Sequence, residues 1–258
     1  MKEIINYKDF VKKIGIKRND KIMINSNFLN IMISAKKKQK NFDLIKLIEA
    51  FLDFLGDNGT LIIPAYSWDF IKKKTFIFEK TKSISGSLSN ILINHKKFSR
   101  TSNPIYSFLV AGKDKKKICS MTHKDSFSLN SPFGYLIKNK GKNLFFDVDY
   151  KDSFTFVHLA EQKTKVNYRF IKDFTGYTFK NSKKRKNTTS MYSRNLEMEV
   201  KGTKIDKKLD KILMKKNLLI KKKIFGINCQ IVDINKTFKI MIDDLKSEKK
   251  LIYPIFKK

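Results

Sequence analysis

The chain has few cysteines and no long apolar run. Cys119 and Cys229 are its two cysteines, and two isolated cysteines do not make a disulfide framework, which indicates a reducing compartment. No stretch approaches the roughly 20 apolar residues that span a bilayer. Residues 1–8 include an early acid and lack the apolar core of a signal peptide. These absences predict a cytoplasmic protein with no membrane span.

Metal-ligating and nucleotide-binding patterns are also scarce. The three histidines are His95, His123 and His158, and no H-x-x-x-H or C-x-x-C spacing occurs. A zinc site normally draws three or four ligands. Neither G-x-G-x-x-G nor G-x-x-x-x-G-K occurs among the ten glycines. The sequence therefore predicts chemistry without a metal and without a glycine-rich nucleotide loop.

Arginine is scarce, although 56 basic and 24 acidic residues give a net charge of +32. Such a charge is typical of proteins that bind nucleic acid or an anionic membrane, but nucleic-acid sites favour the planar fork of arginine. Five of the basic residues are arginine: Arg18, Arg100, Arg169, Arg185 and Arg194. The excess of lysine, asparagine, isoleucine and phenylalanine is typical of a genome rich in A and T, and favours a solvated basic surface. A non-catalytic polyanion-binding protein stays open as the alternative.

Apolar spacing predicts helices and strands in alternation. Residues 41–55 are the clearest helix, because apolar side chains form a wide stripe that ends at Gly56. Further helices are expected over residues 4–14, 87–94 and 235–246, around His158 and after Lys204. Strands are expected over residues 21–24, 61–64, 107–111, 142–148, 192–199 and through 224–227. Residues 181–190 are expected to form an exposed loop. This order predicts an α/β fold, with residues 1–258 as a single domain in which helices flank a mixed or parallel sheet in three layers (α/β/α).

The segment 153–161 reads Ser-Phe-Thr-Phe-Val-His-Leu-Ala-Glu and places His158 three residues before Glu161. On a helix this spacing puts both side chains on one face. A histidine can take a proton from a reacting amine near neutral pH, and a carboxylate one turn away can fix its tautomer and stabilise the imidazolium. A surface ion pair is the alternative interpretation. Strand 142–148 leads into this segment, and loops at the carboxyl ends of strands bind ligands in α/β proteins.

Four blocks in order give the chain a family resemblance. They are Gly56-Asp57-Asn58-Gly59-Thr60-Leu61-Ile62-Ile63-Pro64 with the loop to Asp69, Ser99-Arg100-Thr101-Ser102-Asn103-Pro104-Ile105-Tyr106-Ser107, the segment from His123 to Ser131-Pro132, and Thr155 to Glu161. With these blocks the chain resembles the antibiotic N-acetyltransferase family, which is typified by aminoglycoside 3-N-acetyltransferases and depends on acetyl-CoA. The resemblance implies acetyl transfer to the amine of an amino sugar, either an aminoglycoside or a nucleotide-activated precursor of a surface polysaccharide. The drift toward A and T favours the biosynthetic role.

The resemblance also implies roles for individual residues. His158, oriented by Glu161, would be the general base of a direct transfer, because the thioester is already activated and neither cysteine lies in a matching block. The residues implied on the CoA side are Ser131, Arg100, Ser102, Ser107 and Thr155, and those implied on the acceptor side are Asp69, Trp68, His123, Asn195 and Glu197, with Glu199 as a further acid. An acid beside a stackable tryptophan suits sugar recognition. The implied partners are CoA and a small amine acceptor, with no specific nucleic acid.

Purely structural or surface roles stay open for some of these residues. Arg100 could be a structural arginine that bonds its own loop, Asp69 a loop acid, and His123 a surface histidine. Three positions depart from the family pattern: Asn25 in a strand end that usually reads His-Ser-Ser, Asn103 where a histidine is usual, and Asp147 where a glycine is usual. A catalytically degenerate relative is therefore a second alternative.

Overall fold

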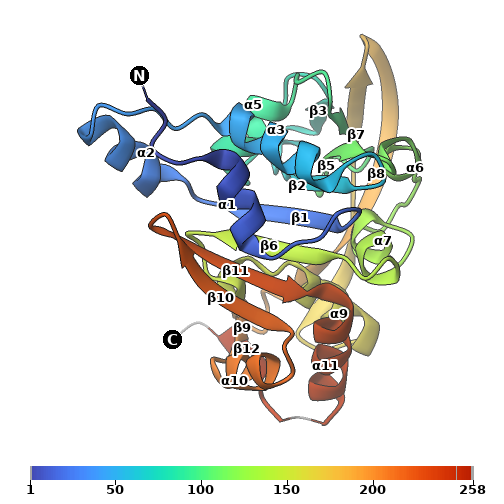
Figure 1. The fold of residues 1–258 in the computed structure, drawn as a ribbon. Helices are drawn as coiled ribbons and strands as arrows, with labels where there is room; N and C mark the ends of the chain where they lie inside the picture. Colours follow the sequence, from blue (N-terminus) through green and yellow to red (C-terminus); the bar gives the residue numbers. More distant parts are fainter. Residues whose placement is uncertain (1, 248, 257–258) are drawn as a thin grey trace.

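A seven-stranded mixed sheet forms the centre of the protein (Figure 1). In the computed structural model, which describes residues 2–247 and 249–256, its strands run in the order β10-β11-β6-β1-β2-β5-β4. The bounds are β1 Lys21–Ser26, β2 Thr60–Pro64, β4 Ser99–Arg100, β5 Phe108–Gly112, β6 Lys142–Phe146, β10 Leu219–Ile224 and β11 Ile227–Asp233. Strand β1 is parallel to both of its neighbours, β2 and β6, and the outer strands pair antiparallel.

Helices cover both faces of this sheet, so the predicted three-layer α/β/α fold is confirmed. Successive residues of β1 alternate between two hydrophobic cores, with Ile22 and Ile24 on one face and Met23 on the other. The first core contains side chains of α1 Tyr7–Ile14, α2 Leu29–Lys37, α3 Leu44–Leu55 and α5 Ser87–Leu92. The second contains side chains of α4 Asp69–Lys73, α6 Lys115–Cys119, α7 Pro132–Lys138, α8 Tyr150–Ser153, α9 Phe156–Thr164, α10 Lys208–Lys215 and α11 Ile234–Ser247.

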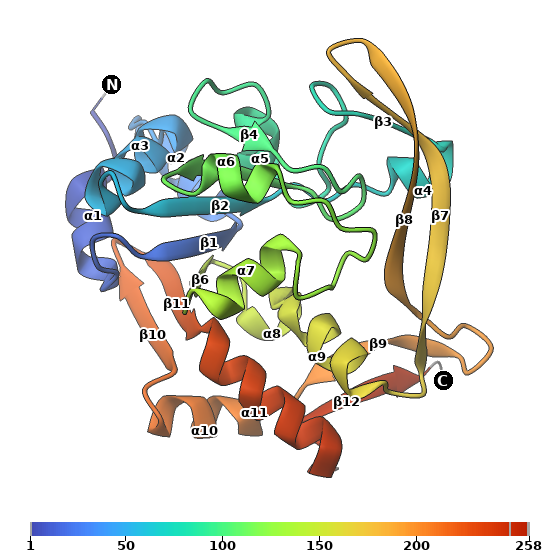
Figure 2. The ribbon, with the colours of Figure 1, turned by 90° about the vertical axis from the view of Figure 1, so that its right-hand side faces the viewer.

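Two small sheets extend the second face. One joins β3 Thr75–Ile77, β7 Arg169–Lys180 and β8 Lys183–Arg194, and the other joins β9 Val200–Ile205 and β12 Ile252–Phe256. Strands β7 and β8 form a long antiparallel hairpin that stands along one side of the molecule, beside α4 (Figure 2). Through this hairpin the lysine-rich segment 181–190 contacts the rest of the fold.

The exposed loop predicted over residues 181–190 is therefore wrong. Asn181 and Ser182 form the two-residue turn of the hairpin, and the rest of the segment belongs to β8. Both turn residues have positive φ, 47° and 62°, as a type I′ hairpin turn requires, and asparagine tolerates that conformation. Both faces of the hairpin are exposed near this turn, so neither face needs apolar side chains. The segment is therefore polar although most of it forms a strand.

Two strand predictions also need correction. The strand predicted through residues 224–227 is the turn of the hairpin β10–β11, where Phe225 and Gly226 have φ of 49° and 85°. The strand predicted over 192–199 ends at Arg194, and residues 196–199 form a turn before β9. In both cases an apolar residue in the turn continued the spacing of apolar residues that predicts a strand. The predicted helices and the buried strands are confirmed within a few residues at each end.

Candidate active site

Three parallel strands bring the predicted residues to one edge of the sheet. Because β1, β2 and β6 run in the same direction, the loops that follow them lie at the same edge. The loop after β6 passes through α8 to α9, which carries His158, and the loop after β2 leads to Trp68 and Asp69. The placement predicted for His158, on a helix behind a buried strand, is confirmed.

His158 is held by the carboxylate one turn along α9. Its Nδ1 lies 2.8 Å from Oε2 of Glu161, and the His158 side chain is 24% exposed whereas that of Glu161 is 0% exposed. A carboxylate on Nδ1 fixes the tautomer with the proton on that nitrogen and leaves Nε2 as the basic atom. The surface ion pair considered from the sequence does not fit, because Glu161 has no contact with solvent.

Three further groups hold Glu161, and the sequence did not point to them. The Tyr168 hydroxyl donates to Oε1 of Glu161 at 3.0 Å, the Thr203 hydroxyl donates to the same oxygen, and Nε of Arg169 lies 2.8 Å from Oε2. Arg169 also donates through Nη2 to the Thr203 hydroxyl at 2.8 Å. These groups come from the start of β7 and from β9, so no local spacing connects them to α9.

The charge state of Glu161 follows from this cluster. Burial by itself raises the pKa of the Glu161 carboxyl, but the hydrogen bond and charge of His158, the charge of Arg169 and the Thr203 hydroxyl outweigh it and leave the pKa below its ordinary value. Glu161 is therefore ionised at neutral pH, as an anion that stabilises an imidazolium must be.

A chain of aromatic contacts connects His158 to the acceptor candidates after β2. The ring of Phe127 lies edge-on to His158 at a centroid distance of 5.6 Å, Tyr106 lies 4.7 Å from Phe127, and Trp68 lies 5.7 Å from Tyr106. Asp69 follows Trp68 at the start of α4, with its side chain 37% exposed and 3.2 Å from Lys73. The aromatic cluster thus places Trp68 and Asp69 on the same side of the sheet as the base.

Asn195 and Glu197, the candidates after β8, line a cavity together with Arg169, which contacts Glu161. The cavity has a volume of about 630 Å³ and is lined by Arg169 from β7, by Ile71 from α4, and by Asn195 and Glu197 from the turn after β8. Glu199 is exposed in the same turn, with φ of 54°. The structure therefore brings Asn195 and Glu197 toward the helix that carries Asp69.

His123 lies in the loop between α6 and α7, and it is not a surface histidine. Both of its ring nitrogens are buried, and neither has a hydrogen-bond partner among the described residues. Burial lowers its pKa, against the opposing charge of Asp125. Asp125 accepts a hydrogen bond from Gln162 of α9, so this loop is tied to the helix that carries His158.

Comparison with known proteins agrees with this architecture. The family model described as aminoglycoside 3-N-acetyltransferase matches residues 35–246. The chain belongs to this family. The match confirms the enzyme class predicted from the sequence, an acyl-CoA-dependent N-acetyltransferase. No curated protein sequence matches the chain closely enough to be informative.

Three solved structures have the same fold. YokD from Bacillus subtilis is 18% identical with a TM-score of 0.70 and covers 94% of this chain and 98% of its own. AAC-IIIb, solved with CoASH, is 15% identical with a TM-score of 0.74 and covers 95% and 97%, and AAC-VIa, solved with sisomicin, is 14% identical with a TM-score of 0.76 and covers 95% and 98%. At these identities the likeness shows the fold.

The three departures from the family pattern have structural partners. Asn103 is buried, accepts hydrogen bonds from the amides of Ile105 and Tyr106, and donates to the hydroxyls of Ser126 and Thr189. Asp147 adopts φ of 51°, where the family has glycine, and its carboxylate accepts two bonds from Asn228. The Asn25 amide donates to Asn143 at 2.8 Å.

Two of the residues implied on the CoA side of the family are engaged inside the protein. Arg100 donates to the Ser107 hydroxyl and to the carbonyls of Ala65, Phe78 and Thr81, and burial lowers its pKa to about 10. The Ser107 hydroxyl also donates to Ala65. These contacts favour the structural alternative for Arg100, and they occupy the Ser107 hydroxyl as well. Thr155 is half-buried before α9 and makes no capping bond, and the Ser102 hydroxyl donates to the carbonyl of Met121.

Ser131 caps α7, and its capping role can be separated from contact with the donor. Its hydroxyl donates to the carbonyl of Ser128 and accepts from the amide of Gly134. We expect Ser131→Ala to lower the free energy of unfolding by about 1 kcal/mol, the usual cost of losing an N-cap, and to weaken CoA binding as well. Asp43→Ala removes the N-cap of α3 on the opposite face and is the control. Equal CoA affinity of the two variants by calorimetry would reduce Ser131 to a helix cap.

Residues 2–247 and 249–256 include no group of three or more His, Cys, Asp or Glu side chains that could hold a metal ion. No helix within these ranges is long and apolar enough to cross a bilayer.

Proposed function

We propose that the protein transfers an acetyl group from acetyl-CoA directly to the amine of an amino sugar, with His158 as the general base. The observation that carries the proposal is the imidazole whose Nδ1 is held 2.8 Å from a buried, ionised carboxylate while Nε2 is left for the reacting group. CoASH in the related AAC-IIIb structure supports acetyl-CoA as the donor.

In this reaction an acceptor ammonium first loses one proton to solvent, and Nε2 of His158 removes the second proton as the neutral amine attacks the thioester carbonyl. The amide bond forms, the carbon–sulfur bond breaks, and CoA leaves as the thiolate, which takes up a proton. The Glu161 carboxylate stabilises the imidazolium formed meanwhile. The base is needed because the attacking nitrogen must lose this proton as the amide bond forms, and water is a poor base near neutral pH.

The cysteines support a direct transfer over an acyl-enzyme. Burial raises the pKa of the Cys119 thiol to about 11 and that of Cys229 to about 12. The thiolate is the nucleophilic form, so neither side chain is a good nucleophile at neutral pH. Both are free cysteines.

On the acceptor side we assign Trp68, Asp69, His123, Asn195 and Glu197. An indole face packs on the apolar face of a sugar ring, while the carboxylates meet its hydroxyl or ammonium groups. The buried, unpartnered nitrogens of His123 would gain a hydrogen bond from a bound ligand. On the donor side we keep Ser131, Ser102 and Thr155.

We further propose that residues 1–258 form one cytoplasmic domain. Strands β10 and β11 from the last quarter of the chain continue the sheet that β1 and β2 begin, which supports a single folding unit. The direct test of the whole proposal is the release of free CoA from acetyl-CoA with a panel of amino sugars. A protein that binds CoA and releases none with any of them would be a degenerate relative.

Asp69 tests the placement of the acceptor. We expect Asp69→Asn to weaken acceptor use by roughly 1 to 3 kcal/mol, the range for a lost charged hydrogen bond, and to leave the CoA dissociation constant unchanged. Loss of a contact made throughout the reaction raises KM, and loss of one made only in the transition state lowers kcat. Asp243→Asn, on the exposed face of α11, is the matched control. Both constants within about twofold of wild type would make Asp69 a loop acid.

A further inference from the structure

A second cavity lies between the β7–β8 hairpin and the body of the protein. It has a volume of about 510 Å³, and we call it the hairpin cavity. Its lining comprises Phe78, Arg100, Ser102, Cys119, Thr178, Lys180, Asn181, Lys183, Arg185, Lys186 and Asn187. Five of these side chains are basic and none is acidic, so the cavity is more one-sided in charge than the protein as a whole.

Four of the five cations are available to a ligand. Arg100 is occupied by carbonyls and by Ser107, but Lys180, Lys183, Arg185 and Lys186 are exposed and have no ion pair or side-chain hydrogen bond to any described residue. Lys180 packs over the ring of Phe78 at 5.6 Å. One acid contacts the hairpin turn: the Glu79 carboxylate accepts a hydrogen bond from the amide of Asn181.

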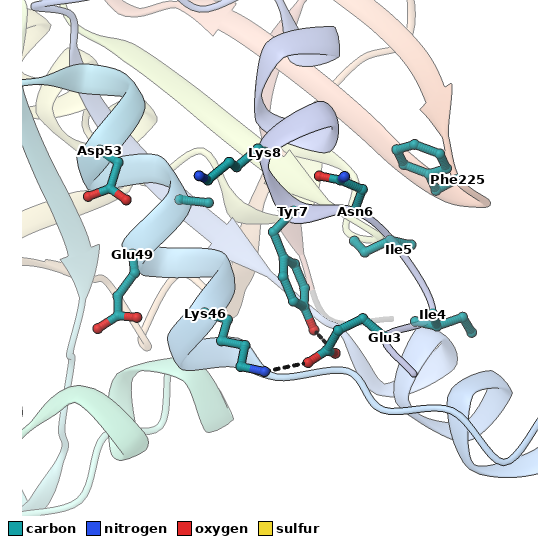
Figure 3. Close-up of a pocket in the computed structure, with 11 residues that line it drawn as sticks. Glu3, Ile4, Ile5, Asn6, Tyr7, Lys8, Lys46, Glu49, Asp53 and Phe225 are labelled. Carbon is teal, nitrogen blue, oxygen red and sulfur yellow. Dashed lines mark hydrogen bonds and ion pairs between the residues drawn. The ribbon is translucent and has the colours of Figure 1, made fainter. Parts of the chain in front are cut away.

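A cavity between α1 and α3 provides the contrast. It has a volume of about 630 Å³, and three acids, Glu3, Glu49 and Asp53, line it together with two lysines. Figure 3 shows that Lys46 is already paired with Glu3, which also accepts from Tyr7. Lys46 is neutralised by Glu3 there and the acids outnumber the lysines, whereas the four exposed cations of the hairpin cavity have no acidic partner among the described residues.

Strand β8 connects the hairpin cavity to the base. Asn187 lines the cavity, and three residues later Ser190 pairs with Asp125 and accepts hydrogen bonds from Ser126, next to the Phe127 that contacts His158. Three residues of a strand span about 10 Å. From Ser190 the contacts with Ser126 and of Phe127 with His158 complete a path along which an extended substrate that reacts at His158 extends to the cavity.

We propose that the hairpin cavity binds a phosphate-bearing nucleotide part of a substrate, and this inference rests on the function proposed above. Lysine and arginine bind phosphate oxygens by charge-assisted hydrogen bonds, whereas a polycationic acceptor would meet like charges. Two sources share this chemistry: the nucleotide of acetyl-CoA and the diphosphate of a nucleotide-activated amino sugar. The second source would make the acceptor a polysaccharide precursor.

The test removes three of the cations together. The variant Lys183→Gln/Arg185→Gln/Lys186→Gln is compared with Lys211→Gln/Lys215→Gln/Lys216→Gln, which makes the same change in charge on and just after α10. Calorimetry with 3′,5′-ADP and with UDP probes binding, and thermal unfolding checks that both variants fold. We expect the hairpin variant to bind at least one of the two nucleotides roughly tenfold or more weakly than wild type, and the α10 variant to bind as wild type does.

The kinetic readout distinguishes the two sources. A higher KM for acetyl-CoA, with weaker 3′,5′-ADP binding, assigns the cavity to the donor. A higher KM for a nucleotide-linked amino sugar, with unchanged use of the free amino sugar and weaker UDP binding, assigns it to the acceptor. Equal weakening by both variants, or no binding of either nucleotide to the wild type, overturns the proposal. Nucleotide binding does not require turnover, so a protein that transfers no acetyl group refutes the proposed function without deciding this one.

Discussion

Replacing His158 by alanine is expected to lower turnover by a factor of roughly 10² to 10⁴, the usual contribution of a general base. The reason is that no other side chain at the site combines a basic nitrogen with a buried carboxylate behind it. His123 is the nearest alternative in sequence order, but burial lowers its pKa, and neither of its ring nitrogens has a hydrogen-bond partner among the described residues that would orient it as a base. Acetyl-CoA should still bind the variant, because the imidazole accepts a proton from the amine and is not required to hold the thioester.

The measurement is thiol release with the best acceptor found, together with CoA affinity by calorimetry. His95→Ala is the control, since His95 packs at 5.8 Å against Phe98, which belongs to the hydrophobic core on the opposite face of the sheet. It should turn over like the wild type. Near wild-type turnover of His158→Ala would remove this residue from the mechanism, and loss of CoA binding along with turnover would indicate a structural role.

The parts of the site that could be predicted from the sequence are those encoded locally. The i, i+3 spacing of His158 and Glu161 is a property of one helix, and the strand before it is a short apolar run with clear ends. Family motifs reinforced the same segment. A helix-period pattern and a buried strand keep their identity whatever surrounds them, which is why these predictions were confirmed.

The groups around Glu161 could not be predicted because they come from distant segments. Thr203 is 42 residues from Glu161 in the chain and reaches it across the small sheet β9–β12. Tyr168 and Arg169 lie nearer, just before and at the start of β7, but nothing in the sequence there indicates that this end of the strand faces α9. Sequence order alone also left the lysine-rich segment as a loop, since an exposed hairpin has no apolar alternation. The hairpin cavity exists only because that segment folds back.

Glu161→Gln should be the most costly change to stability near the site. Its carboxylate is 0% exposed, and the variant leaves the guanidinium of Arg169, 8% exposed, without its anionic partner. Removing one member of a buried ion pair costs about 3–5 kcal/mol, so the free energy of unfolding at pH 7 should fall by that order. Glu49→Gln, on α3 across the sheet, is the control and should change it little.

The sign of the pH dependence follows from the lowered pKa of Glu161. Its stabilising contribution is fully present above the ordinary value of 4.5 and is lost as the pH falls through the lower pKa in the folded state. The glutamine variant has no such loss. The difference in stability between wild type and variant should therefore narrow as the pH is lowered below about 4.5, and urea unfolding at several pH values measures it. A difference that stays constant with pH would mean that the charge of Glu161 is not what stabilises the cluster.

The same variant tests the catalytic coupling of the pair. Without the carboxylate, no anion on Nδ1 orients the ring or stabilises the imidazolium that forms during the reaction. Turnover at the optimum should fall, but by less than in His158→Ala, since the base itself is retained. Turnover equal to that of Glu49→Gln would show that Glu161 supports the fold and not the base.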